Sequence, residues 1–503
     1  MIPYPNHLVR HPGHFTIRPV LQVMAAPEAR RAVDLLAGYL ARPVHSGDTI
    51  GFELDPEIEP EGYELHVTPD RVWLKAATGE GFLHGVQTIR QLLLDGSARL
   101  PCVWVRDAPR LPWRGVLLDV ARHFMPLDFL REFVDLLALH KYNVLHLHLT
   151  DDQGWRVEIN GWPKLTAVGA WRAESMVGPA GSGVFDGVPH GGFYTQRELR
   201  DLVAFADARG VRIVPEIDLP GHVRAALAAY PELGNRPGRR RGVWTEWGIS
   251  HDILGVHQTA FRFCWDVLGQ VADVFPAPHI HIGGDECPTD QWADNPLALD
   301  RAAQLGLRDV SELHAWYLGE LNDIVTDLGR RAMCWDETGH SAGTLRPELV
   351  VTAWRDAAHG ALAVHRGHQV VMAPHTSTYF DYRQSDGPDE PPPARVTTVQ
   401  DVLRFDPLGG LPVADPAGTE PGVLGTQAQL WTEHAPTPDH VRQLAFPRLC
   451  ALAETAWSRD QRGYADFQRR LTGHLERLRA LDALPKERVR FAGAVPVSGK
   501  TVP

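Results

Sequence analysis

The chain has 503 residues, of which 44% are hydrophobic and 22% charged, so it reads as a globular protein with room for more than one domain. Its formal net charge of −12 excludes a general nucleic-acid binder, which needs a basic face, and the absence of any run of ~18 apolar residues excludes a predicted membrane span. The first residues lack the layout of a signal peptide and the five cysteines are scattered without a CxxC pair, so we expect a cytoplasmic protein with neither a disulfide framework nor a cysteine zinc site.

Residues 1–110 are expected to form a small α+β domain. Residues 61–76, EGYELHVTPDRVWLKA, alternate apolar and polar side chains on either side of Pro69-Asp70, which predicts a β-hairpin. Residues 79–96, GEGFLHGVQTIRQLLLDG, predict a helix that ends near Gly96. Residues 106–115, RDAPRLPWRG, then read as a linker to the next domain.

Residues 111–480 alternate strand-like and helix-like runs. Residues 127–140 have apolar side chains at helical spacing, and residues 195–210 begin with a capping box of Thr195 and Glu198 and end at Gly210. The predicted strands are residues 115–120, 143–149, 211–218, 279–284, 331–335, 350–354, 369–373 and 423–431. About eight strands with helices between them predict a (β/α)8 TIM barrel, with a doubly wound sheet as the alternative and residues 481–503 as a C-terminal tail.

Polar and aromatic residues follow the predicted strands at their carboxyl ends, which meet on one face of a barrel. Along the chain they are Arg122, Asp151, Asp152, Glu216, Asp218, His222, Asp285, Glu286, Trp335, Trp354, Tyr379, Asp381, Trp431 and Glu433. One such residue alone is more often a helix cap, an ion pair or core packing. Eight successive strand ends that all carry such residues indicate a site, and a set of acids, one arginine and several indoles suits a neutral polyhydroxylated ligand.

The chain resembles the family 20 glycoside hydrolases, the β-N-acetylhexosaminidases, in six motifs: RGVLLDVARHF, NVLHLHLTDDQGWR, VPEIDLPGH, HIGGDE, YFDY and LWTE. The resemblance covers nearly the whole chain. It implies a small α+β domain before the barrel, and an exo-acting, retaining enzyme that removes terminal non-reducing β-GlcNAc or β-GalNAc. It also implies that no cofactor or metal takes part.

The resemblance further implies substrate-assisted catalysis, in which the carbonyl oxygen of the substrate's 2-acetamido group is the nucleophile and an oxazolinium ion is the intermediate. In this scheme Glu286 is the general acid and later the base. Asp285 orients the acetamide and stabilises its developing positive charge, and the Tyr379 hydroxyl binds the acetamide oxygen. We expect repulsion from Asp285 to keep Glu286 protonated near neutral pH.

The other implied site residues bind the substrate or support the acid. They are Trp335, Trp354 and Trp431 for the acetamide pocket and the floor under the sugar; Arg122, Asp381 and Glu433 for the hydroxyls; and Asp151 and His222 as a supporting pair near the acid. Since Asp381 and Glu433 would close the non-reducing end, they favour an enzyme that encloses a single sugar.

Three alternatives remain open at this stage. The histidine pairs His146/His148 and His279/His281 would be zinc ligands in a metal-dependent barrel hydrolase. A sugar-binding module without catalysis and a disaccharide-specific member such as a lacto-N-biosidase are the other two. The expected partner is a small carbohydrate or glycoconjugate, with no nucleic acid and no membrane, and the chain is a monomer or a homodimer. The sequence does not choose between GlcNAc and GalNAc, or define the linkage and the aglycone.

Overall fold

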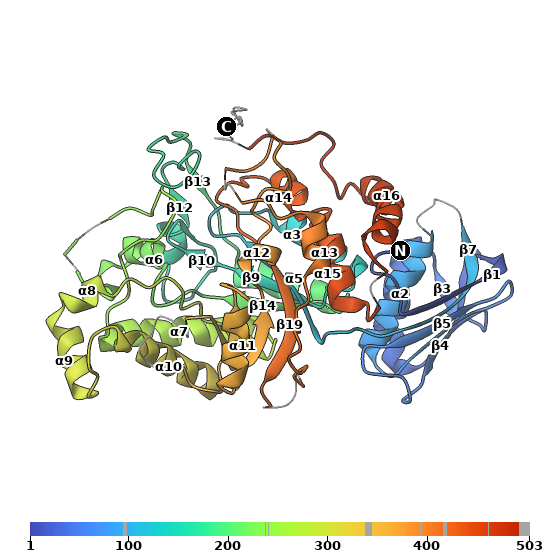
Figure 1. The fold of residues 1–503 in the computed structure, drawn as a ribbon, viewed down its shortest axis with the longest axis horizontal. Coiled ribbons are helices and arrows are strands. Elements are labelled where there is room, and N and C mark those ends of the chain that lie inside the picture. Colours follow the sequence, from blue (N-terminus) through green and yellow to red (C-terminus); the bar gives the residue numbers. More distant parts are fainter. Residues whose placement is uncertain are drawn as a thin grey trace, which may run out of the picture.

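The computed structural model describes residues 1–93, 98–236, 238–239, 241–337, 345–387, 389–392, 395–415, 420–460 and 462–491. Figure 1 shows a small domain, drawn in blue, at one end of a larger barrel that forms the rest of the molecule. No helix within the described ranges has both the length and the apolar character that crossing a membrane would require.

The small domain is a seven-stranded sheet with two helices, which confirms the predicted α+β class, whereas the sequence predicted only one hairpin and one helix in it. The strand order is β1-β7-β5-β6-β4-β2-β3. The bounds are β1 His7–Thr16, β2 Leu21–Ala25, β3 Val44–Ser46, β4 Ile50–Leu54, β5 Tyr63–Val67, β6 Val72–Ala76, β7 Arg99–Asp107, α1 Arg30–Leu40 and α2 Gly79–Leu93, with a short 3-10 turn at Pro27–Ala29. Strands β5 and β6 form the predicted antiparallel hairpin, in which Val67 pairs with Val72. The predicted end of α2 near Gly96 lies outside the described residues.

The second domain is a closed barrel of eight parallel strands, which confirms the TIM barrel and shows that the doubly wound alternative is wrong. The strands in chain order are β8 Trp113–Asp119, β9 Val144–His148, β14 Arg212–Glu216, β15 His279–His281, β16 Arg331–Trp335, β17 Val350–Ala353, β18 Gln369–Met372 and β19 Gly422–Leu430. Nearly every residue of these strands is buried, because one face of a parallel sheet packs on helices and the other on the barrel interior.

Helices pack around the barrel and bury its outer surface. They are α3 Leu127–Leu139, α5 Gln196–Asp207, α7 Gln258–Val274, α10 Glu312–Asp327, α11 Ala357–His365, α13 Val399–Arg404, α14 Pro438–Ala445, α15 Arg448–Trp457 and α16 Tyr464–Ala480. Shorter elements lie in the loops: α4 Lys164–Ala167, α6 Arg224–Ala229, α8 Asp290–Ala293, α9 Pro296–Gln304, α12 His375–Thr378, a 3-10 turn at Pro231–Leu233, and the strand pairs β10 Thr150–Asp151 with β11 Gly154–Trp155 and β12 Trp171–Arg172 with β13 His190–Gly191. The predicted capping box begins α5: the Thr195 hydroxyl accepts from the Glu198 backbone N–H at 3.2 Å, and the Glu198 carboxylate accepts from the Thr195 backbone N–H at 2.8 Å.

The small domain joins the barrel at its amino-terminal end, through a buried polar cluster. Lys141 lies between α3 and β9, and its Nζ donates to Asp107 Oδ2 and to the Tyr63 hydroxyl, each at 2.8 Å. The Trp457 indole N–H, at the end of α15, donates to the same Asp107 oxygen at 2.9 Å. Two residues of each domain therefore share one set of hydrogen bonds, at the end of the barrel opposite to the carboxyl ends of the strands.

Candidate active site

The acid pair follows β15 through a glycine turn that the fold requires. Gly283 and Gly284 have φ of +68° and +93°, and a Cβ on Gly283 would lie 1.8 Å from Asp218 Oδ1. A side chain at Gly283 is therefore excluded by sterics as well as disfavoured by the backbone. After the turn, the Asp285 side chain points inward and is 16% exposed, whereas the Glu286 side chain is 37% exposed. The two neighbouring acids thus lie in different environments.

An aspartate–histidine pair supports the acids from the next strands of the barrel. His222 Nδ1 lies 3.2 Å from Asp151 Oδ1, and His222 Nε2 lies 3.7 Å from Glu286 Oε2 and 3.9 Å from Asp285 Oδ2. Burial disfavours a charged imidazole, but the negative charge of Asp151 and its hydrogen bonds outweigh this effect and hold the pKa of His222 well above its usual value. The protonated ring therefore connects Asp151 to both members of the acid pair.

The pKa values of Glu286 and Asp285 differ from those expected from the sequence. Burial raises the pKa of Glu286, but the positively charged His222 ring beside it outweighs burial, so the pKa of Glu286 is lowered. Burial and the charge of Glu286 raise the pKa of Asp285. The expectation that repulsion keeps Glu286 protonated is thus wrong for the free enzyme, because His222 was not included in it and because Glu286 is the more exposed of the two acids.

Asp218 is a second buried acid close to Asp285. Burial and the nearby charge of Asp285 raise the pKa of Asp218 well above its usual value. Its Oδ1 accepts from the Gly284 backbone N–H at 3.1 Å, which ties it to the glycine turn. A protonated Asp218 is a hydrogen-bond donor, and it leaves the negative charge of this buried pair on Asp285.

Glu216 is the centre of a buried network that the sequence analysis placed at a strand end without a role. Its carboxylate has four partners from three other strands: His148 Nδ1 at 2.6 Å, Trp335 Nε1 at 2.7 Å, His146 Nε2 at 3.0 Å and His281 Nδ1 at 3.1 Å. His148 Nε2 also contacts Asp151 Oδ2 at 2.8 Å, so a chain of contacts runs from Glu216 through His148 to Asp151. The strand patterns HLH and HIH were the sequence signals of this network.

The histidine pairs considered as zinc ligands are therefore split. His146 and His281 lie with Glu216, their ligand atoms within 4.8 Å of one another, and His148 joins Glu216 to Asp151. His279 lies apart, with its ring 5.6 Å from Trp113 at the other end of the barrel interior. The partners of the first three histidines are carboxylates that also hold Trp335 and Arg122.

Four aromatic rings form an arc beside Asp285. The ring of Trp335 lies 5.8 Å from that of Trp431, which lies 6.3 Å from the ring of Tyr379, which lies 6.4 Å from that of Trp354. The Trp335 indole is fixed by its bond to Glu216. The negative charge of Asp285 contributes to a raised pKa of Tyr379, after burial, which places the phenol near the carboxylate and keeps it protonated as a donor.

The three residues predicted to bind hydroxyls lie on the other side of Trp431. Arg122 is held by Asp151 at 2.9 Å and by the Gln153 side chain at 3.2 Å, and its guanidinium lies 5.0 Å from the centre of the Trp431 ring. Burial and the charge of Glu433 raise the pKa of Asp381 well above its usual value. Asp381 Oδ1 is buried without a hydrogen-bond partner in the described part of the chain, so it can accept from a ligand.

All the site residues expected from the sequence thus lie at the carboxyl end of the barrel, in three connected groups. The first is the acid pair with Asp151 and His222, and the second is the aromatic arc. The third is the set of residues predicted to bind the sugar hydroxyls: Arg122, Asp381 and Glu433. Asp119, Gln153, Glu216 and His148 hold these groups in place, and the sequence analysis did not predict this supporting role for any of them.

The comparisons with known proteins show the family of the chain. The chain matches the model of the glycosyl hydrolase family 20 catalytic domain over residues 111–460 and that of the family's domain 2 over residues 1–108. It is 35% identical over 477 residues to a β-hexosaminidase of Porphyromonas gingivalis, covering 92% of this chain but 59% of that protein. It is 36% identical over 428 residues to a β-hexosaminidase of Akkermansia muciniphila, covering 83% of this chain and 84% of that one. The crystal structure of a GH20 exo-β-N-acetylglucosaminidase from Vibrio harveyi in complex with N-acetylglucosamine aligns with a TM-score of 0.86 at 32% identity, covering 96% of this chain and 77% of that one.

A parallel barrel with paired carboxylates and an aromatic pocket at its carboxyl end, matched over this length, defines a glycoside hydrolase. The chain belongs to glycoside hydrolase family 20, because the family's catalytic and preceding domains together match nearly all of it. Its activity is that of a β-N-acetylhexosaminidase.

Proposed function

We propose that the enzyme removes one terminal non-reducing β-GlcNAc or β-GalNAc residue at a time, with retention, by substrate-assisted catalysis. The observation that carries the proposal is the different environment of each member of the acid pair. Asp285 points inward beside the aromatic arc, and one of its oxygens is buried without a partner in the described residues, while Glu286 is exposed at the mouth. An acetamide group bound within the arc would bring its N–H to Asp285.

The first chemical step forms the oxazolinium ion. Trp335, Trp354 and Trp431 enclose the acetamide, Asp285 accepts its N–H, and the Tyr379 hydroxyl donates to its carbonyl oxygen. That oxygen attacks the anomeric carbon as the bond from this carbon to the leaving oxygen breaks. Holding the nucleophile close to the anomeric carbon replaces a bimolecular step by an intramolecular one. The ionised Asp285 stabilises the positive charge that develops on the acetamide.

Glu286 transfers the proton in both steps. It protonates the leaving oxygen, and it then takes a proton from the water that opens the oxazolinium ion on the same face from which the leaving group departed. In the free enzyme burial raises the pKa of Glu286, but the neighbouring His222 outweighs this effect and lowers it, and the exposed part of the side chain is open to water. A bound sugar displaces that water, so the neutral form of Glu286 becomes more favourable when the substrate is in place. The imidazolium of His222 stabilises the carboxylate after the proton has left.

The residues predicted to bind the sugar hydroxyls, Arg122, Asp381 and Glu433, support exo action. Arg122 is anchored on both sides by Asp151 and Gln153, and Asp381 and Glu433 lie close enough to raise the pKa of Asp381. Such a set of donors and acceptors would bind the hydroxyls at the non-reducing end of a single sugar. A cytoplasmic location and a monomeric or homodimeric state stay predictions from the sequence, and light scattering on the purified protein measures the latter.

One comparison of two substrates tests the proposal. The enzyme should hydrolyse 4-nitrophenyl N-acetyl-β-glucosaminide rapidly and the matching β-glucoside not at all, with no effect of EDTA, because the glucoside lacks the internal nucleophile. Equal turnover of both substrates would show that an enzyme group is the nucleophile. Loss of activity in EDTA would instead support metal chemistry at the histidines around Glu216, and no turnover of either substrate would favour a disaccharide-specific member or a binding module.

A further inference from the structure

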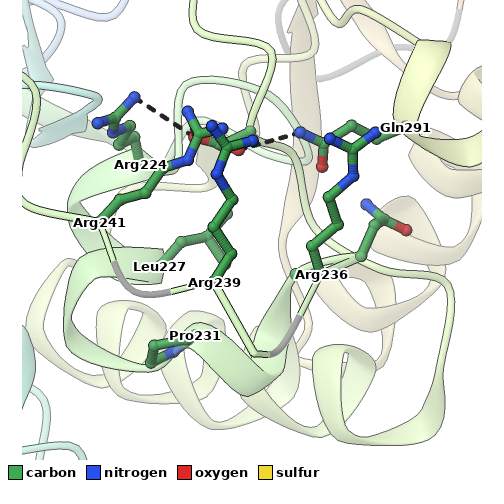
Figure 2. Close-up of a pocket in the computed structure, with 10 residues that line it drawn as sticks. Arg224, Leu227, Pro231, Arg236, Arg239, Arg241 and Gln291 are labelled. Carbon is green, nitrogen blue, oxygen red and sulfur yellow. Dashed lines mark hydrogen bonds and ion pairs between the residues drawn. The ribbon is translucent and has the colours of Figure 1, made fainter.

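A surface pocket in the loops between β14 and α8 gathers arginine side chains. We call it the arginine pocket and define it by Arg224, Arg236, Arg239, Arg241, Asp252 and Gln291. Figure 2 shows the guanidinium groups of Arg224, Arg239 and Arg241 pointing toward one region of the pocket, with Arg236 and Gln291 on its other side. Such a concentration of positive charge is unusual in a chain whose formal net charge is −12.

The acidic groups of the pocket do not balance its positive charge. Asp252 is the only carboxylate among the described residues that line it. Its Oδ2 lies 2.8 Å from Arg241 Nη1 and 3.4 Å from Arg224 Nη1, and its Oδ1 accepts from Gln291 Nε2 at 3.0 Å. Both oxygens of Asp252 are therefore engaged, and one carboxylate is shared by two guanidinium groups.

The remaining donors of the pocket have few acceptors. Arg236 pairs with Asp294, at 3.3 Å, which is not part of the pocket wall. Arg239 has no ion-pair partner in the described ranges, and Arg241 Nε is buried without a hydrogen-bond partner there. Arginine stays protonated at every physiological pH, so the pocket cannot relieve the repulsion by losing a proton. A bound anion would satisfy these donors and offset the repulsion.

We propose that the arginine pocket binds an oxyanion group: a carboxylate, a sulfate ester or a phosphate. Planar guanidinium groups match the oxygens of such groups in pairs, which favours them over simple halide ions. The pocket is small, with room for a charged group but not for a sugar ring. The ligand is therefore a free oxyanion or the charged substituent of a larger molecule.

The position of the pocket suggests what carries that substituent. Arg224 comes two residues after His222, and its backbone N–H donates to Asp152 Oδ1 at 2.9 Å, while Asp152 Oδ2 lies 3.3 Å from His222 Nδ1. Gln291, on the opposite wall, comes five residues after Glu286. Both walls thus continue from the loops that hold the acid and its support. Since the general acid faces the leaving group, glycans with an acidic leaving sugar are the substrate class that fits; this step rests on the proposed role of Glu286.

Binding of inorganic phosphate tests the pocket itself. Isothermal titration calorimetry at low ionic strength should show one saturable site in the wild-type enzyme. Arg239→Gln should weaken that binding at least about tenfold, because it removes a charge-assisted contact. Arg239 has no partner to lose in the described structure, so this variant should fold normally. Arg197→Gln, an exposed arginine on α5, is the matched control and should bind like the wild type. No saturable binding, or equal binding by wild type and Arg239→Gln, would overturn the proposal.

Turnover identifies the source of the oxyanion. Chitobiose has a neutral leaving sugar, whereas β-N-acetylglucosaminyl-(1→4)-glucuronic acid has a carboxylate on it. If the pocket binds the acidic group of the substrate, Arg239→Gln lowers kcat/KM for the acidic disaccharide several-fold and leaves kcat/KM for chitobiose unchanged. If the variant loses phosphate binding but hydrolyses both disaccharides like the wild type, the pocket binds the free ion. If the wild type hydrolyses neither, the proposed function fails, while the phosphate titration still decides on the pocket.

Discussion

Replacing Glu216 by glutamine tests whether the buried network holds the site. The carboxylate is fully buried, has hydrogen bonds with His148 at 2.6 Å and Trp335 at 2.7 Å, and lies 3.0 Å from His146 Nε2 and 3.1 Å from His281 Nδ1. Because His148 is held protonated largely by the negative charge of Glu216, against burial, a neutral side chain leaves a buried cation without one of its two carboxylates. Removing one member of a buried ion pair costs about 3–5 kcal/mol. We expect the free energy of unfolding to fall by that amount, and kcat to fall as Trp335 and Asp151 lose their positions.

Chemical denaturation followed by tryptophan fluorescence measures the first effect, and the pH profile of kcat measures the second. The matched control is Glu53→Gln, since Glu53 also accepts from an indole, Trp73 Nε1, at 2.7 Å and pairs with Lys75 at 3.1 Å, but on the surface of the small domain. Exposed pairs of this kind contribute less than about 1 kcal/mol. A loss at Glu216 no larger than at Glu53, together with an unshifted pH profile, would refute the argument that the network supports both stability and catalysis.

Three other predictions concern the acid pair and the buried histidines. Glu286→Gln should slow hydrolysis of chito-oligosaccharides by about 10²–10⁴-fold and that of 4-nitrophenyl glycosides much less, since only poor leaving groups need the proton; equal losses on both would count against the acid role. Asp285→Asn should lower kcat by about 10²-fold or more with an unchanged circular dichroism spectrum, and an unchanged rate would remove Asp285 from the mechanism. Burial lowers the pKa of His140 and of His146 to about 4, so both stay neutral in the fold while the unfolded chain takes up protons below its pKa of about 6.5. Their contribution to stability is therefore present above about pH 6.5 and is lost as the pH falls toward 4. His148 and His222, whose pKa values are raised, act in the opposite direction, so the test compares variants: between pH 7.5 and 5, His140→Gln should lose less stability in urea unfolding than the wild type, and an equal loss would contradict this reasoning.

Much of the fold could be predicted because the barrel strands are short apolar runs, and because capping residues and glycines mark where the helices between them begin and end. The strand at residues 331–335 was predicted to the residue, and the capping box of Thr195 and Glu198 gave the start of α5. Closure of the sheet was predicted from the number of strands and from the polar residues at the strand ends. The polar cluster of Lys141, Asp107 and Trp457 could not be predicted, because its members are far apart in the chain and each looks like an ordinary surface or core residue.

The site residues could be found from the sequence because they directly follow strands, but their electrostatics could not. The pKa of Glu286 depends on His222, which comes from another strand, and on an exposure that only the turn at Gly283 and Gly284 determines. The importance of Glu216 likewise depends on partners from three other strands. Patterns along the chain show which side chains reach the carboxyl end, whereas the distances between strands decide which charges they meet.

The polar cluster at the amino-terminal end of the barrel bears on how such a two-domain enzyme can evolve. Lys141 belongs to the barrel, yet the carboxylate that compensates its buried charge, Asp107, belongs to the small domain. Deleting the small domain would leave this lysine without its counter-ion on a newly exposed face. An unrelated domain in place of the small one would therefore have to supply a carboxylate at the position of Asp107 to keep the hydrogen bonds of Lys141 and Trp457.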